Sequence, residues 1–252
     1  MNIQSKQSYI RGRSRWRAVD RIATVAIIVV SVAILGLMIG DRFAPRSASA
    51  PAVSQGNGPL EAVDGLATSI NSTARMNGQP RVAIVEFSDF ECPFCGQYAR
   101  NTYERIVDDY VKPGKITYVF KHFPLPNHRF AMPAAEAADC ARQGGKFWQM
   151  HDRLFANQTA FDPASLLQSA TAVGLDERNF SECIRGDVPR NAVNTDLEEG
   201  VRLEIKSTPT FFFGFVGSDG KLELVQRLTG AYPYAAFKIA IELLLQRSSK
   251  SS

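Results

Sequence analysis

A Cys-x-x-Cys pair lies where a short apolar run gives way to a long helical pattern, and this arrangement constrains the fold more than any other feature. Residues 82 to 87, VAIVEF, have the β-branched and aromatic character of a strand. The helical pattern begins at Cys92 and continues to about Val111, and a second strand-like run, ITYVFKHF, follows at residues 116 to 123. This order predicts two parallel strands joined by a crossover helix, and so an α/β fold.

The rest of the folded chain changes pattern twice. From about residue 127 to 206 only helical periodicity is found. The helical stretches lie near residues 130 to 143, 146 to 156, 163 to 173, 176 to 185 and 189 to 205. After them, TPTFFFGF predicts a strand, GSDG a turn, KLELVQRLTG its hairpin partner, and about residues 232 to 246 a closing helix. An all-helical insertion therefore separates the parallel unit from a hairpin and a helix.

The N-terminus predicts a membrane anchor. Residues 22 to 40 carry no charge and, at about 1.5 Å per residue, roughly match the 30 Å hydrocarbon core of a bilayer. A basic segment, residues 1 to 21 with six Lys and Arg residues, precedes this run. We therefore expect a cytoplasmic N-terminus and a single-pass protein of the cytoplasmic membrane. Residues 41 to 59 read as a linker, and residues 60 to 252 as the extracytoplasmic, periplasmic or cell-surface domain. An Ala-x-Ala pattern ending at Ala50 leaves a cleaved signal peptide as the alternative.

The net charge of +4 does not indicate nucleic-acid binding, because six of the 29 Lys and Arg residues lie in the first 21 positions. The cysteines do not indicate a metal site either. A structural zinc site usually has four ligands, whereas Cys140 and Cys183 are far apart in sequence and have no histidine beside them.

The spacing of Cys92 and Cys95 favours thiol-disulfide exchange. If Cys92 caps the helix, Pro93 occupies the first turn, and the unpaired amides of that turn point at the Cys92 sulfur. A helix N-terminus stabilises a thiolate and lowers its pKa, which predicts Cys92 as the nucleophile. Cys95, one turn further, is then the buried resolving thiol.

The motif FSDFECPFC, the helical insertion after it and the motif STPTFFFG resemble the DsbA-like branch of the thioredoxin superfamily, the extracytoplasmic thiol-disulfide oxidoreductases. The resemblance covers about residues 60 to 247. It implies a thioredoxin fold interrupted by a helical domain, with Cys92 as attacking and Cys95 as resolving cysteine. It also implies that Thr208 and Pro209 form the family's cis-proline loop, which faces the cysteines and binds substrate main chain. No metal or organic cofactor is implied.

Three further residues take their expected roles from the resemblance. Glu86 lies where the family has a buried acid beneath the disulfide, and we expect it to relay a proton to and from Cys95; an outward-facing strand carboxylate is the alternative. Pro93 and Phe94 are expected to contact substrate. The strongly oxidising relatives carry a histidine in this dipeptide, so Phe94 leaves the direction of electron flow open.

The remaining cysteines and histidines have expected structural roles. We expect Cys140 and Cys183 to form a structural disulfide, as similar family members often do, with two buried free thiols as the alternative. His122 could tune the active site, although a core or surface position is favoured. We interpret His128 and His151 as structural.

The sequence thus predicts a monomeric, membrane-anchored oxidoreductase that introduces disulfides into unfolded, reduced exported proteins and is reoxidised by a membrane redox partner. The alternatives are a disulfide reductase of the same fold and a non-catalytic holdase or metal-binding module.

Overall fold

The computed structural model describes residues 60–70 and 73–250, which belong to one compact unit, Gln55–Ser252. The predicted membrane anchor at residues 22 to 40, the basic segment before it and the linker at residues 41 to 59 lie outside the described residues. Within the described ranges, no helix combines the length and apolar character that a membrane span needs.

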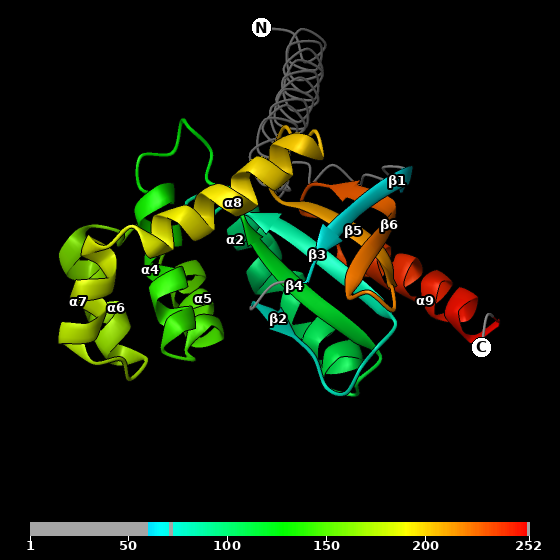
Figure 1. Cartoon of the computed structure of the whole chain (residues 1–252), viewed down its shortest axis with the longest axis horizontal. Coiled ribbons are helices and arrows are strands. Elements are labelled where there is room, and N and C mark those ends of the chain that lie inside the picture. The colour runs from blue at the N-terminus through cyan, green and yellow to red at the C-terminus, as the bar shows by residue number, and fades with distance from the viewer. Residues whose placement is uncertain (1–59, 71–72, 251–252) are drawn as a thin grey trace, which may run out of the picture. The chain divides into compact units, whose positions relative to one another are not determined.

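A six-stranded mixed sheet forms the centre of this unit (Figure 1), in the order β1-β6-β5-β3-β4-β2. Its strands are β1 (Glu61–Ser69), β2 (Ala74–Arg75), β3 (Val82–Ser88), β4 (Ile116–His122), β5 (Thr210–Val216) and β6 (Lys221–Thr229). β3 and β4 are parallel, as predicted, and every other neighbouring pair is antiparallel. All residues of β3 and β4 are buried, which fits central strands covered on both faces.

Helical segments connect the strands. β3 leads into a continuous run of α2 (Pro93–Tyr98), η1 (Ala99–Tyr103), α3 (Glu104–Ile106) and η2 (Val107–Val111), in which η1 and η2 are π-helical turns. The insertion between β4 and β5 contains α4 (Ala131–Gln143), α5 (Phe147–Ala156), α6 (Pro163–Ala172), α7 (Glu177–Arg185) and α8 (Val188–Arg202). The chain closes with α9 (Tyr234–Lys250). This is a thioredoxin fold with an all-helical insertion.

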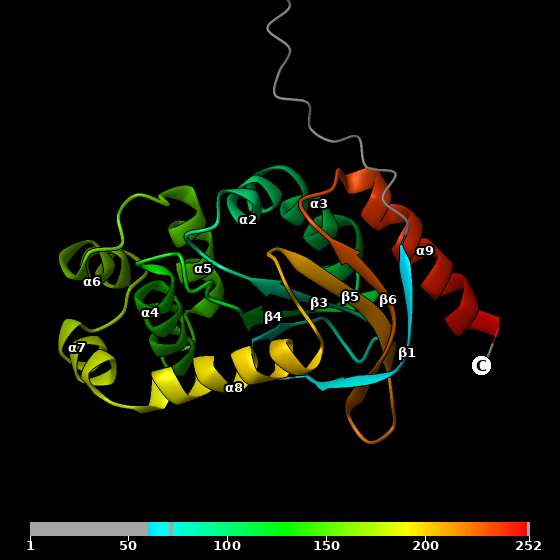
Figure 2. The same cartoon turned by 90° about the horizontal axis from the view of Figure 1, so that it is seen from above.

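The two faces of the sheet are covered by different helices. Figure 2 shows α2, α3 and α9 along one face and α8 along the other. On the first face the rings of Tyr98, Phe211 and Phe237 pack against one another, with centroids 4.5 to 5.1 Å apart. On the other, Gly200 of α8 allows a close approach, because a Cβ there would lie 2.5 Å from the Phe123 ring. Glycine at this position therefore lets α8 of the insertion pack closely against this face of the sheet.

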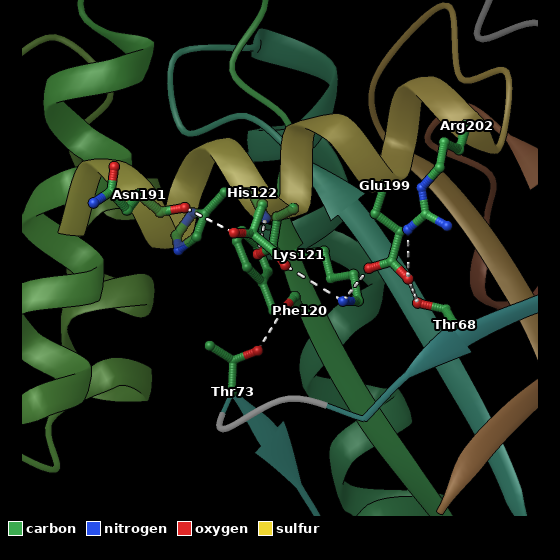
Figure 3. Close-up of polar contacts among 10 residues, drawn as sticks. Thr68, Thr73, Phe120, Lys121, His122, Asn191, Glu199 and Arg202 are labelled. Carbon is green, nitrogen blue, oxygen red and sulfur yellow. Dashed lines mark hydrogen bonds and ion pairs between the residues drawn. The ribbon is translucent and has the colours of Figure 1, made fainter. Parts of the chain in front are cut away.

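A buried ion cluster also attaches the insertion to the sheet (Figure 3). The Lys121 ammonium of β4 lies 2.5 Å from Glu199 and 3.3 Å from Asp196, both on α8. The Thr68 hydroxyl of β1 donates to the second Glu199 oxygen, and the His122 amide donates to Asp196. Since these side chains are almost entirely buried, each charge depends on its partners.

Candidate active site

The cysteine pair lies at the start of α2, directly after β3. Cys92 has the extended backbone of a helix N-cap, and Pro93 is the first helical residue. The Cys92 amide donates to the Asp89 carbonyl, and the Gly96 amide donates to the Cys92 carbonyl. Cys92 and Cys95 are 3% and 0% exposed, and both are free thiols. The local structure therefore places Cys92 at the predicted helix N-terminus and Cys95 beneath it.

The two thiols have opposite pKa shifts. The Cys95 thiol, the Thr208 side chain and the amides of residues 94 and 95 lower the pKa of Cys92 to about 6, against the opposing effect of burial. Burial and the neighbouring Cys92 raise the pKa of Cys95 well above its ordinary value. At neutral pH the reduced pair therefore holds a Cys92 thiolate beside a Cys95 thiol, a division between nucleophile and resolving group.

The loop before β5 closes the site on the opposite side. The Thr208–Pro209 peptide bond is cis, and the Cys92 sulfur lies 3.5 Å from the Thr208 carbonyl oxygen. β5 pairs with β3, so the loop before β5 is held beside the turn after β3. The Phe94 side chain is 60% exposed, unlike the cysteines that flank it. The structure thus brings Thr208, Pro209, Pro93 and Phe94 around the predicted nucleophile.

Glu86 is buried in β3, which excludes the outward-facing alternative. The Tyr118 hydroxyl donates to its Oε2 at 2.6 Å, and the Tyr98 and Tyr118 hydroxyls are 2.8 Å apart. Burial outweighs these contacts and raises the pKa of Glu86 to about 7. The Ser88 hydroxyl, two residues along the strand, lowers the pKa of both Glu86 and Cys95. A carboxyl that titrates near neutrality can both supply and accept a proton.

Two of the three histidines are core residues, as the sequence analysis favoured, and the third contacts the turn before Cys92. His122 and His151 are buried, and burial lowers the pKa of each. His128 lies nearer the catalytic turn, with its Nδ1 2.7 Å from the buried Asp89 carboxylate. Burial lowers the pKa of His128, but Asp89, Cys92 and Glu91 outweigh it and raise that pKa. His128 therefore contacts a buried carboxylate of the turn that precedes Cys92, a position that the sequence did not indicate.

Gln158 is the second residue that the sequence did not indicate. It lies in the turn after α5, and its side-chain amide donates to the main-chain carbonyls of Phe90 and Cys92, each at 2.8 Å. Position 158 lies 66 residues from Cys92, and no local pattern links the two.

The other cysteines form a separate feature. A disulfide joins Cys140 of α4 to Cys183 of α7 within the insertion. Across residues 60–70 and 73–250, no group of three or more His, Cys, Asp or Glu side chains has the arrangement of a metal site.

The family model described as thioredoxin matches residues 72–221. The chain belongs to the thioredoxin family. A Cys-x-x-Cys pair at a helix N-terminus of this fold, with one thiol acidic and the other protonated, performs thiol-disulfide exchange. The cysteine pair of this chain therefore has the arrangement that thiol-disulfide exchange requires.

Solved structures of DsbA-type proteins share its fold. Oxidised BdbD from Bacillus subtilis aligns with a TM-score of 0.63 and 21% identity, over 74% of this thioredoxin-family chain and 99% of BdbD. Wolbachia pipientis alpha-DsbA1 aligns at 0.60 and 19%, over 71% and 93% of the two chains. Pseudomonas aeruginosa DsbA2 aligns at 0.55 and 22%, over 72% and 97%. Each alignment spans more than nine tenths of the DsbA-type structure and shows that the fold is shared.

Curated relatives by sequence are much longer proteins. The chain is 35% identical over 195 residues to a Na(+)/H(+) antiporter NhaA 3 of Salinispora tropica, covering 75% of the chain but 29% of the antiporter. It is 39% identical over 132 residues to a Salinispora arenicola antiporter, NhaA 1, covering 52% and 20%. The chain therefore spans less than a third of the length of these relatives.

Proposed function

We propose that the protein introduces disulfide bonds into unfolded, reduced exported proteins. The observation that carries this proposal is the asymmetric cysteine pair, with the pKa of Cys92 lowered to about 6 and that of Cys95 raised. A stabilised Cys92 thiolate lowers the free energy of the reduced enzyme. The enzyme gains this stabilisation when it transfers its disulfide to a substrate, so the equilibrium favours oxidation of the substrate.

The reaction begins with attack of a substrate thiolate on the Cys92 sulfur of the oxidised pair. The Cys92–Cys95 bond breaks, its electrons pass to the Cys95 sulfur, and a mixed disulfide forms between substrate and Cys92. Cys95 leaves as a thiolate and takes a proton, and we assign the donor role to Glu86, a buried carboxyl with a pKa of about 7. The high pKa of Cys95 makes this protonation favourable.

A second substrate thiolate then attacks the substrate sulfur of the mixed disulfide. The substrate disulfide forms, and Cys92 leaves as a thiolate that needs no proton at neutral pH. The substrate has lost two electrons and the enzyme has gained them. Thr208 and Pro209 offer main chain for the substrate backbone, and the exposed Phe94 and Pro93 offer apolar contact.

The location and the partners follow from the same chemistry. A donor must be reoxidised, and we assign that step to a membrane redox partner, with the enzyme anchored by residues 22 to 40 and its catalytic domain outside the cytoplasm. The Cys140–Cys183 disulfide supports an oxidising compartment. Protease added outside intact cells should remove the domain, and protection until lysis would contradict this topology.

A reductase is the second candidate, and Phe94 is the observation that favours it. A phenyl ring between the cysteines cannot supply the positive charge that a histidine would give to the thiolate. In this structure the His128 imidazole contacts Asp89 of the same turn, and although burial lowers its pKa, Asp89 and Cys92 outweigh burial and raise it, which favours the positively charged form of His128. We therefore favour the donor.

The experiment that tests the proposal mixes oxidised enzyme, without oxygen, with a reduced unfolded protein whose activity needs its disulfides. We expect each enzyme to remove two substrate thiols while Cys92 and Cys95 become reduced. Cys92→Ser should abolish the transfer, and the double variant Cys140→Ala/Cys183→Ala, if folded, should retain it. Efficient reduction of insulin without substrate oxidation would support the reductase instead.

A further inference from the structure

Gln158 of the helical insertion contacts the catalytic turn directly. Its Nε2 donates to the carbonyl oxygens of Phe90 and Cys92, both at 2.8 Å. A side-chain amide carries two N–H donors, so both hydrogens are used by the two carbonyls. These carbonyls belong to the first and last residues of the segment Phe90–Cys92, which leads into α2. The glutamine therefore fixes the segment from both ends.

The opposite end of the Gln158 amide is held as well. Arg100 of η1 donates from Nη1 to the Gln158 Oε1 at 3.2 Å and to the Phe155 carbonyl at 3.1 Å. Because Arg100 is only a donor and the two carbonyls are only acceptors, the amide has one orientation that satisfies all of them. Figure 2 shows α5 beside α2, so these contacts join the insertion to the active-site helix.

Gly96 makes room for this arrangement. A Cβ at position 96 would lie 1.8 Å from the Gln158 Oε1 and 2.8 Å from the Arg100 Nη1. No side chain larger than hydrogen fits there while Gln158 keeps its place. Gly96, the residue after Cys95, is thus required for the close contact with Gln158 of the insertion.

We propose that Gln158 is a positioning residue for the Cys92 thiolate, so that the insertion, through the Gln158–Arg100 contact, sets the reactivity of the cysteine pair. The reason is geometric. The amides of residues 94 and 95 stabilise the thiolate only while the turn at Phe90–Cys92 aims the Cys92 sulfur at them. Without Gln158 the turn loses two carbonyl contacts and can rotate the sulfur away. The inference rests on thiol-disulfide exchange at Cys92 and does not depend on the direction of electron flow.

The test uses Gln158→Met in the purified full chain, because methionine keeps the length of the side chain and removes its donors. We measure the rate of Cys92 alkylation against pH and the equilibrium of the pair with glutathione. The loss of one or two ordinary hydrogen bonds should raise the midpoint of the alkylation profile by about 0.5 to 1 pH unit. The glutathione equilibrium should move toward oxidised enzyme by about three- to tenfold, as the thiolate loses that stabilisation.

Gln143→Met is the matched control, since Gln143 is exposed on α4 and its amide lies near Asp139, away from the turn. It should leave both readouts unchanged. A folded Gln158→Met with the parent's alkylation midpoint and glutathione equilibrium would overturn the proposal.

If Gln158→Met does not fold, Arg100→Met decides the question, because Arg100 is exposed and its loss frees the Gln158 amide. A smaller shift in the same direction is expected, and no shift would overturn the proposal. An enzyme that failed to oxidise substrates but showed the Gln158 shift would refute only the donor assignment.

Discussion

At the scale of single residues, the acid–base behaviour of the site depends on burial and on hydrogen bonds from separate parts of the chain. Burial raises the pKa of Glu86 to about 7, whereas hydrogen bonds lower that of Cys92 to about 6. At pH 7 the Cys92 thiol is therefore mostly ionised, while the Glu86 carboxyl is protonated for about half of the time. This is the condition for a thiolate nucleophile served by a carboxylic acid.

Glu86 predicts a specific dependence of stability on pH. Its folded pKa lies above its ordinary value of 4.5, so its contribution is fully present below about pH 4.5 and is lost as pH rises through about 7. The loss amounts to about 3 kcal/mol for a shift of this size. Glu86→Gln removes the ionisation, so between about pH 4.5 and about pH 8.5 the variant should gain about 3 kcal/mol relative to the parent.

Denaturant unfolding of reduced parent and variant at the two pH values measures this difference. Cys92 contributes with the opposite sign, because its depressed pKa adds stability as pH rises through about 6. That contribution is present in both proteins and cancels in the comparison. Parallel pH profiles for parent and variant would show that Glu86 is ionised without cost in the folded protein. The variant should also exchange disulfides more slowly, since it lacks the proton donor that we propose for Cys95.

Some of these residues could be predicted from sequence and others could not. The spacing of Cys92 and Cys95 after an apolar run carries its own chemical reason, and the resemblance pointed to Glu86, to the cis Thr208–Pro209 bond and to the disulfide of the insertion. Gln158 and His128 reach the site from loops that only the folded chain brings close, so no spacing in the sequence marks them.

At the scale of the elements, the insertion is attached to the sheet through buried charge. Lys121 of β4 faces two carboxylates of α8 (Figure 3), and its side chain is 2% exposed. Removing one partner of such a cluster leaves charge without compensation in a dry interior. The attachment of α8 to β4 should therefore be sensitive to Lys121 alone.

Lys121→Met is expected to lower the free energy of unfolding by about 3 to 5 kcal/mol, because Asp196 and Glu199 lose their shared cation. Lys112→Met is the control, since Lys112 pairs with Asp108 on the surface, where both side chains are more than half exposed. That change should cost less than about 1 kcal/mol. Urea unfolding of the two variants and the parent gives the comparison, and equal losses would contradict the role of the buried cluster.

The sequence predicted most elements within a few residues. Periodicity located the insertion helices, and the turn signal located the hairpin of β5 and β6. It did not predict β1, most of whose residues are exposed, or the two-residue β2. Nor did it predict the π-helical turns η1 and η2, which interrupt the helix expected from Cys92 to Val111. Edge strands and helical irregularities are stabilised by tertiary contacts, which local patterns do not encode.

At the scale of the whole molecule, the fold brings three segments to one thiol. Cys92 lies between β3 and α2, and the loop before β5 places Thr208 beside its sulfur. From the insertion, Gln158 donates hydrogen bonds to the carbonyls of Phe90 and Cys92. The fold class was predicted from the order of the elements and the resemblance. The anchor at residues 22 to 40 lies outside the described residues and remains a prediction.

The reduction potential of the Cys92–Cys95 pair, measured against glutathione as a function of pH, tests the donor role most directly. With Cys92 a thiolate and Cys95 a thiol, reduction takes up one proton for two electrons, so the potential should fall by about 30 mV per pH unit above about pH 7 and by about 59 mV per unit well below pH 6. Repeating the titration in Glu86→Gln removes the other group that titrates near neutrality. At pH 7 we predict a potential less negative than about −230 mV. A value at or below about −270 mV, the level of thioredoxin, with a slope of about 59 mV up to pH 8, would contradict a stabilised Cys92 thiolate and favour the reductase.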